Sequence, residues 1–343
     1  MTLKAVIMND TRSDNHFGCF RVMRIIEENL AARGIRVTAR SPVRHEWAKD
    51  AAFLAALSES DVVVINGEGT LHHGARRGEM VLRVVDHPAC ADKPVALVNA
   101  LYQDNPDAWG RFLEKMALIS TRDSRSAAAA ARHSGKPVGF VPDLSLCEAF
   151  AMPAVPVERN RLLVGDSISK DISRTLLRIV EERPDAYLLP ITKALKASKA
   201  HLPLPLRAFR EGYIRLHAAA FRLQQPRVLF NKTEAGFMQD LLTGYLHVTG
   251  RFHSVCLCLV TRTPFLAVDS NSWKISALLE DLGLGKQRLL SPQDLKSRAG
   301  SSQAAPYSED ELAIIEAGLR QCQEKAHHLF DDIARLAAGA TPA

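Results

Sequence analysis

Short apolar runs alternate with amphipathic segments along most of the chain. Lys4–Met8 is an apolar run that predicts a strand, and Phe20–Leu30 follows with apolar residues at near-helical spacing. Gly34 stands where a glycine would end that helix, and the next residues begin a second apolar run. A strand, a polar loop, a helix and a second strand in this order predict a parallel βαβ unit.

The same alternation continues to about residue 150 and predicts one α/β domain. Met152–Val157 contains two prolines and no regular pattern, which is typical of a linker. A second alternation starts at Arg161, includes a predicted strand at Arg227–Phe230, and precedes a long amphipathic helix at Ser308–Leu336. We therefore predict an α/β fold of two Rossmann-like domains that face a cleft, with boundaries 1–150 and 158–307, and a C-terminal helix and tail over 308–343.

Composition excludes several classes of protein. The chain has 343 residues, of which 47% are hydrophobic and 24% charged, as in ordinary globular proteins. No apolar run approaches the roughly 20 residues that a membrane-spanning helix needs, and the first ten residues are too weakly apolar for a secretory signal. Six cysteines without a CxxC pair favour reduced thiols. We expect a cytoplasmic protein, with a peripheral place at the inner face of the membrane as an alternative.

Positive charge is concentrated between residues 191 and 227. The net charge of the chain is +6, and this stretch alone carries eight basic residues against one acid, Glu211. One interpretation is a solvated helix face. The other is a contact with an anionic partner, such as a phosphorylated sugar, a lipid-linked diphosphate or a membrane surface. Nothing in the chain resembles a zinc finger or a nucleic-acid-binding motif, so no nucleic-acid partner is expected. The sequence leaves the oligomeric state open.

The first candidate site is the polar loop Asn9–Gly18, between the first predicted strand and helix. A helix N-terminus offers free N–H groups and a positive dipole end, which suit an anion. Arg12 and His16 would add charge-assisted hydrogen bonds. The alternative is an ordinary polar loop with a capping asparagine.

The second candidate site is Asn66–Gly74. Glu68 lies between two glycines at a strand end, where it could act as a general base. The glycines match neither the dinucleotide-binding pattern nor the P-loop. Adjacent His72 and His73 lack the partners that a metal site needs, so we predict no metal and interpret them as polar side chains of the surface or of the cleft.

The third candidate site is Thr249–Ser254, between an apolar strand and an apolar helix. Arg251 suits bidentate recognition of a carboxylate or a phosphate, and His253 suits proton transfer near neutral pH. The alternative is a capping histidine beside a surface arginine. Cys256 and Cys258 are expected in the core, and no nucleophile-elbow motif supports a hydrolase.

These residues resemble a known family. Gly250–His253 resembles the Gly-Arg-x-His signature of polysaccharide pyruvyl transferases, and Ser120–Ser126 resembles the family's Ser-x-Arg-Asp-x-x-Ser element. Val141–Leu144 is similar to its Asp-Pro element. Val268–Ile275, continuing to Leu284, is similar to its Asp-x-Lys-Ile and Leu-Gly-Leu element. The order and approximate spacing agree over about residues 4–285.

Two loops depart from the family pattern. Asn66–Gly69 replaces a loop that is commonly Gly-Gly-Gly-like, and Asn15–Gly18 replaces one of Asn-x-Gly-Asp character. Both departures fall on the expected acceptor side, so they bear above all on which acceptor the chain would use.

The resemblance implies a GT-B-like fold and a transferase that uses phosphoenolpyruvate as donor and a sugar as acceptor. The product would be a pyruvate ketal on a surface polysaccharide or its lipid-linked precursor, with no cofactor. Carried over by position, Arg251 would bind the donor, His253 would transfer a proton, and Lys274 would support the anionic donor. The other predicted residues are Ser254 and Asn271 for the donor; Arg12, Asn15, His16 and His72 for the acceptor; and Glu68 as base.

The sequence alone leaves two other functions open. A glycosyltransferase of the same architecture would use a nucleotide-activated sugar, with Glu68 as the acceptor base and Arg251 and Lys274 on the leaving phosphate. A binding module in a polysaccharide-assembly complex would keep the fold and bind no donor.

Overall fold

The computed structural model describes residues 2–199, 202–269, 272–295, 297 and 306–340. These residues divide into two compact units that are each discontinuous in sequence. The first unit comprises the described residues of 1–12, 22–147 and 321–343. The second comprises those of 13–21 and 148–320.

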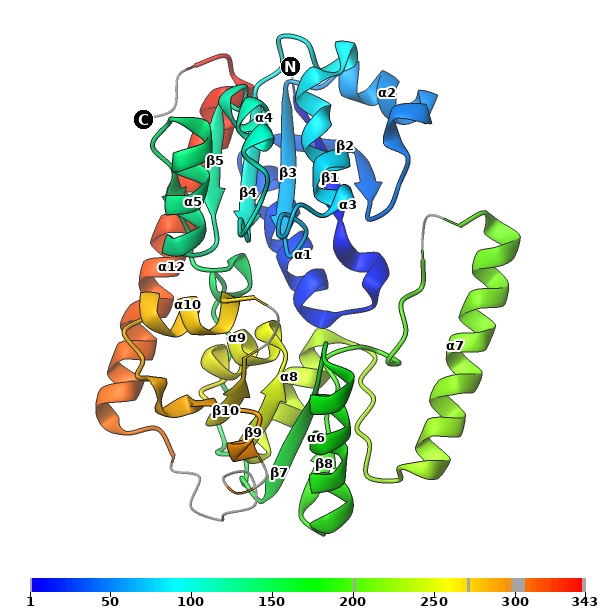
Figure 1. The fold of residues 1–343 in the computed structure, drawn as a ribbon, viewed down its shortest axis with the longest axis vertical. Coiled ribbons are helices and arrows are strands. Elements are labelled where there is room, and N and C mark those ends of the chain that lie inside the picture. Colours follow the sequence, from blue (N-terminus) through cyan, green and yellow to red (C-terminus); the bar gives the residue numbers. More distant parts are fainter. Residues whose placement is uncertain (1, 200–201, 270–271, 296, 298–305, 341–343) are drawn as a thin grey trace. The chain divides into compact units, whose positions relative to one another are not determined.

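The first unit is built on a parallel sheet of six strands (Figure 1). The strand order is β2-β1-β3-β4-β5-β6, and every pairing between these named strands is parallel. Strands buried on both faces have nearly continuous apolar sequences, and β3 is buried along its whole length. The strands are β1 (Leu3–Asp10), β2 (Ile35–Pro42), β3 (Val62–Glu68), β4 (Val95–Ala100), β5 (Leu118–Thr121) and β6 (Gly139–Phe140).

Helices cover both faces of this sheet because alternate strand residues point to opposite sides. Val63 and Ile65 face a core with α2, α3, α4 and α5, whereas Val62 and Val64 face a core with α1 and the end of α12. The helices are α1 (Phe17–Ala32), α2 (Ala51–Ser58), α3 (Arg76–Leu82), α4 (Gly110–Glu114), α5 (Ser124–Ser134) and α12 (Glu309–Ala337).

The second unit is built on a parallel sheet of five strands in the order β11-β10-β9-β7-β8. One face packs against α6, and α9 is buried along its whole length. The elements are β7 (Arg161–Ser167), α6 (Lys170–Glu182), β8 (Ala186–Leu188), α7 (Leu204–Gln224), α8 (Glu234–Leu242), β9 (Gly244–Gly250), α9 (Phe252–Val260), β10 (Phe265–Val268), α10 (Lys274–Asp281) and β11 (Leu289–Leu290).

The predicted α/β class, with two parallel sheets and a long C-terminal helix, is confirmed. The predicted strand at Arg227–Phe230 is wrong, because this segment makes only an isolated bridge between Val228 and Leu188. Helix α3 and strand β11 were not predicted. None of the described helices combines the length and the apolar composition that crossing a membrane requires.

Each sheet has one point where the strand order reverses. In the first unit this switch point lies between β1 and β3, and in the second between β7 and β9. Loops leaving the carboxyl ends of two such strands diverge, which opens a space for a ligand. The side chains just after β1, β3, β7 and β9 are therefore the places to look for a site.

Candidate functional site

An arginine and an aspartate lie at the ends of the two strands that flank the switch point of the second unit. Asp166 is near the end of β7, and Arg251 directly follows β9. The Arg251 guanidinium donates from Nε and Nη2 to Asp166 Oδ2, at 2.8 and 2.5 Å. Its Nη1 forms no hydrogen bond to a described residue. Arg251 is thus held in place by a carboxylate and keeps donors for an anion.

Gly250 allows the two strands to come this close. In the register of the sheet, Gly250 stands opposite Ser167. A Cβ atom at Gly250 would lie 2.6 Å from the Ser167 Cβ, which is too near for any real contact. The glycine of the family signature therefore permits the strand packing on which the Arg251–Asp166 pair depends.

His253 lies in the first turn of α9 and is nearly buried. Its ring packs edge-on against the ring of His16, with 5.1 Å between their centroids. His16 belongs to the chain segment 13–21, which is part of the second unit. The structure therefore brings a residue predicted for the acceptor side directly against the predicted proton-transfer residue.

The segment that carries His16 is anchored by backbone hydrogen bonds to residues 191–193. The Phe17 N–H donates to the Ile191 carbonyl at 3.0 Å, and the Lys193 N–H donates to the Asn15 carbonyl at 2.9 Å. The Asn15 side-chain amide also donates to the Lys196 carbonyl at 3.2 Å. Asn15, predicted to bind the acceptor, therefore holds this segment in place within the second unit.

Gly18 is the point of closest approach between the segment and His253. A Cβ atom at Gly18 would lie 2.2 Å from His253 Cγ. We expect Gly18→Ala to displace the imidazole and to lower turnover by about 10²-fold, because a small misplacement of a reacting group is costly. Gly139→Ala, where a Cβ would meet nothing within 4 Å, is the matched control. Steady-state kinetics on both variants checks this; equal turnover would contradict the assigned contact.

Two helix N-termini lie at this place. Helix α1 begins at Phe17, beside His16, and α9 begins at Phe252, beside His253. The first N–H groups of a helix have no partners within the helix and carry partial positive charge. Together with Arg251, they form an environment that favours a phosphate or a carboxylate.

His16, Cys19 and His253 also form a cluster of metal-type ligands, with one ligand atom from each within 4.8 Å of the others. Among the described residues, no other group of three such side chains lies this close together, and neither His72 nor His73 belongs to this one. The dipoles of α1 and α9 oppose a cation here and favour an anion.

The remaining residues predicted for the donor have different surroundings. Ser254 is fully buried in the first turn of α9, and its hydroxyl has no hydrogen-bond partner among the described residues. Lys274 is half-buried at the start of α10, which follows β10, the strand next to β9. Asn271 lies outside the described residues.

Another histidine of the second unit, His247, lies on β9. His247 is fully buried within the sheet, and this burial lowers its pKa to about 3. Its imidazole is therefore neutral throughout the physiological range. His247 belongs to the core of the second unit and has no donor role in the proposed chemistry.

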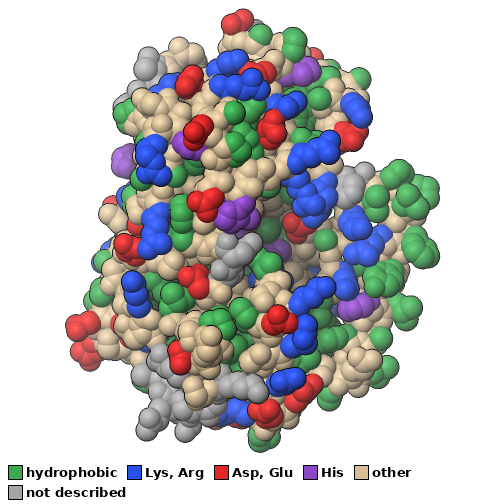
Figure 2. Space-filling model, in the orientation of Figure 1, with side chains coloured by type: hydrophobic (Ala, Val, Ile, Leu, Met, Phe, Trp, Pro, Cys, Tyr) green, Lys and Arg blue, Asp and Glu red, His purple; other side chains and the backbone are tan. Residues whose placement is uncertain are grey.

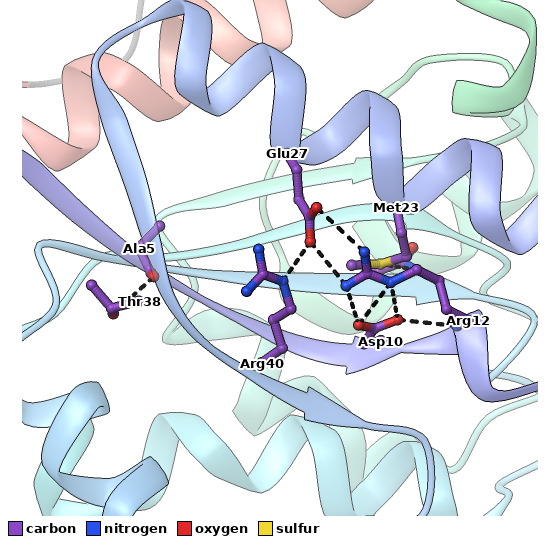
Figure 3. Close-up of polar contacts among 8 residues, drawn as sticks. Ala5, Asp10, Arg12, Met23, Glu27, Thr38 and Arg40 are labelled. Atoms are coloured by element: carbon purple, nitrogen blue, oxygen red, sulfur yellow. Dashed lines mark hydrogen bonds and ion pairs between the residues drawn. The ribbon is translucent and has the colours of Figure 1, made fainter. Parts of the chain in front are cut away.

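In the first unit, Arg12 is engaged by two carboxylates (Figure 3). Its guanidinium donates to Asp10 at 2.5–3.0 Å and to Glu27 at 2.9 Å, and Arg40 donates to the same Glu27. The hydrogen bond to Asp10 is the main cause of the raised pKa of Arg12. Arg12 thus fixes the end of β1 against α1, whatever contact it also makes with an acceptor.

Three strands of the first unit end in strained backbone. Asn9, Glu68 and Asn99 have φ angles of +65°, +36° and +55°, in the left-handed region that non-glycine residues avoid. The Asn9 amide donates to the Asn66 carbonyl at 2.6 Å and to Thr70 Oγ1 at 2.9 Å, across the switch point between β1 and β3. Strain of this kind accumulates at functional sites. The edge that carries Glu68 is therefore a candidate binding surface.

The loops after β3 and β4 run side by side. His72 pairs with Gln103 in a parallel bridge, and the His73 N–H donates to the Gln103 carbonyl at 2.8 Å. The His72 side chain is half-buried, whereas His73 is exposed and 3.4 Å from Asp104. His72, predicted to contact the acceptor, therefore lies in a loop that is hydrogen-bonded to the neighbouring loop.

Two further segments of the resemblance meet within the first unit. Arg122 and Asp143 are both buried and form an ion pair at 3.7 Å. Asp123 caps α5 through the Ser126 N–H at 2.7 Å and accepts the Ser126 hydroxyl at 2.9 Å. These contacts tie β5, α5 and the loop after β6 together within the first unit.

Sequence reasoning missed Asp166. The signal available was an apolar run, Leu162–Val164, followed directly by Gly-Asp-Ser at a strand end. A carboxylate after a buried strand is too common a pattern to be singled out. Only the pairing of β7 with β9 shows that it meets Arg251.

Comparison with known proteins gives one match at the level of family. The family model described as "Polysaccharide pyruvyl transferase" matches residues 28–272. This range includes Glu68, Arg251 and His253, and excludes His16 and Lys274. A search of the curated proteins found no significant match.

Solved structures share the fold over nearly the whole chain. A putative UDP-N-acetylglucosamine 2-epimerase from Listeria monocytogenes is 11% identical, with a TM-score of 0.55 over 100% of this chain and 99% of that one. UDP-GlcNAc 2-epimerase from Neisseria meningitidis, solved with UDP-GlcNAc, is 10% identical (TM-score 0.52; 93% and 97% covered). The glycotransferase of kitacinnamycin is 11% identical (TM-score 0.51; 98% and 99% covered). At such identities the likeness shows the fold alone, which is GT-B-like.

Proposed function

The chain belongs to the polysaccharide pyruvyl transferase family, and from this premise we propose that it transfers a pyruvyl group from phosphoenolpyruvate to a saccharide. The observation that carries the proposal is the arrangement at the switch point of the second unit. There, Arg251 is held by Asp166, and His253 stands at the N-terminus of α9 against His16. A cation and a proton-transfer group beside two helix N-termini fit a small three-carbon anion.

The donor phosphate and carboxylate are bound by Arg251 and by the helix N-termini, with Lys274, Ser254 and Asn271 as further predicted contacts. His253 gives a proton to the methylene carbon of phosphoenolpyruvate, and positive character develops at the central carbon. One sugar hydroxyl adds to that carbon, the bond to phosphate breaks, and a second hydroxyl closes the ketal. The two hydroxyls lose one proton each. One of these protons restores the proton that His253 gave to the methylene carbon, and the other leaves with phosphate.

The acceptor is proposed to be the sugar of a surface polysaccharide or of its lipid-linked precursor. Glu68 is the proposed base that takes the hydroxyl proton, and the strained end of β3 supports a functional role for its loop. Arg12, His72, Asn15 and His16 stay predictions as acceptor contacts. The ring contact between His16 and His253 supports a positioning role for His16 in the proposed donor chemistry.

Thermal unfolding in the presence of each candidate donor tests the proposal. We expect phosphoenolpyruvate to raise the Tm by a few degrees at saturating concentration, because a ligand bound only to the native state stabilises it. The shift should disappear in Arg251→Ala and persist in Arg36→Ala, an exposed arginine at the start of β2.

Nucleotide-activated sugars are the comparison ligands in the same experiment. A shift with a nucleotide sugar and none with phosphoenolpyruvate would replace the proposal by a glycosyltransferase of the same fold. If neither ligand shifts the Tm of the folded chain, a binding module without donor chemistry becomes the better description.

A further inference from the structure

Helix α7 exposes an apolar stripe to solvent. Among the described residues, ten large hydrophobic side chains are exposed, and six of them lie on this one helix. Phe209 is 78% exposed and Leu216 is 71% exposed. Successive stripe residues are three or four positions apart, so they lie on one side of the helix. The apolar stripe consists of Leu206, Phe209, Tyr213, Leu216, Ala220 and Leu223.

A different side of α7 packs on its own unit. Ile214 is the buried residue of this helix, and the ring of Phe221 lies 5.9 Å from that of Phe230. At 100° per residue, Ile214 and Phe221 are more than a quarter turn away from the centre of the stripe. Figure 2 shows hydrophobic side chains gathered along the outer edge of α7. The stripe is therefore not needed for the fold of the second unit, and it is free to contact something else.

The charge of α7 indicates what that contact is. The helix carries Arg207, Arg210, Arg215 and Arg222 against a single acid, Glu211. An apolar stripe with arginines on the remaining surface is typical of a helix that lies flat in the interface of an anionic membrane. With 21 residues, α7 is about 30 Å long, which gives an extended line of contact. No described helix could cross the membrane, so the contact is peripheral.

We propose that α7 docks the protein on anionic membrane surfaces, with the apolar stripe inserted at the level of the headgroups and the arginines attracted to anionic lipid. A second copy of the chain is the less favoured occupant, because pairing two such helices would bring four arginines and one glutamate from each copy together. The proposal does not depend on the chemistry of the second unit's site, although docking would bring the protein close to a membrane-bound acceptor.

Sedimentation of the full chain with sucrose-loaded vesicles tests the docking. We expect binding to vesicles of phosphatidylcholine mixed with phosphatidylglycerol, and much weaker binding to phosphatidylcholine alone. Phe209→Ser with Leu216→Ser should weaken binding to the mixed vesicles about tenfold or more, because apolar burial drives interfacial binding. Arg207→Gln with Arg215→Gln should weaken it by a similar factor, and added salt should do the same.

Matched controls come from exposed residues outside α7. Val155→Ser with Ile168→Ser removes apolar side chains that are 76% and 50% exposed. Lys49→Gln with Arg174→Gln removes two exposed positive charges. Both control variants should bind the mixed vesicles like the parent chain, and all variants should keep its far-UV circular dichroism and Tm.

Three results would overturn the proposal: no binding of the parent chain to the mixed vesicles, equal loss in the control variants, or a dimer in analytical ultracentrifugation that Phe209→Ser with Leu216→Ser dissociates. Because no donor or acceptor is present, none of these results bears on pyruvyl transfer. Equally, a chain that binds vesicles but releases no phosphate from phosphoenolpyruvate would leave the docking intact.

Discussion

Replacing His253 with alanine is expected to lower turnover by about 10²–10⁴-fold, which is the usual contribution of a placed proton donor. The loss should fall on kcat, because in the proposed mechanism phosphoenolpyruvate is bound by Arg251 and the helix N-termini, and these remain. The shift in Tm with phosphoenolpyruvate should therefore survive in the variant. Phosphate release in the presence of a saccharide acceptor, measured against the Tm shift, separates the two effects.

The control for this prediction is His328→Ala. His328 is exposed on α12, so its loss should change neither turnover nor stability. Near-normal turnover in His253→Ala would remove the proposed role of the histidine. Loss of both turnover and the Tm shift would instead assign His253 to donor binding.

The largest expected effect on stability comes from Asp143→Ala. Asp143 is fully buried and pairs with Arg122, whose side chain is also buried. Removing one member of a buried ion pair is strongly destabilising and costs about 3–5 kcal/mol. The Ser145 N–H would also lose its acceptor, which is Asp143 Oδ1 at 2.9 Å. Urea unfolding should show the loss as a lower midpoint.

An exposed ion pair provides the comparison. Arg83 and Glu79 pair at 2.7 Å on the surface of α3, and Glu79→Ala should cost less than about 1 kcal/mol. The double variant Arg122→Met with Asp143→Leu should recover much of the stability lost in Asp143→Ala, because apolar residues of similar volume replace a buried pair well. If Asp143→Ala cost no more than Glu79→Ala, the buried pair would not carry the stability assigned to it.

Elements with strong local patterns were predictable from sequence. The sequence predicts a strand at Leu118–Thr121, which matches β5, and a helix at His253–Val260, which differs from α9 by one residue. Both are short apolar runs bounded by polar residues or by a glycine, so local sequence decides where they start and end. The Arg251–His253 pair was predicted as a site for the same reason, because it lies between two such runs, and its role stays a prediction.

Features that depend on distant pairing were not predictable. Arg227–Phe230 has the composition of a strand, but it forms only one bridge. The segment 13–21 reads as a loop leading into a helix of the first domain, yet its hydrogen bonds go to residues 191–193 of the second unit. Asp166 can be recognised as part of the candidate site only through its contact with Arg251. In each case the deciding partner is remote in sequence.

The division of both units into separate pieces of sequence has a consequence for how the chain reaches its native state. Residues 13–21 leave the ribosome early, but their partners at 191–193 are made much later. The first unit, in turn, is completed only by residues beyond 320. Neither unit can therefore fold completely before the last of its own segments has been made. Contacts of such long sequence separation slow folding, so residues 13–21 stay without their partners until residues 191–193 are made, and the first unit stays incomplete until the residues beyond 320 are made.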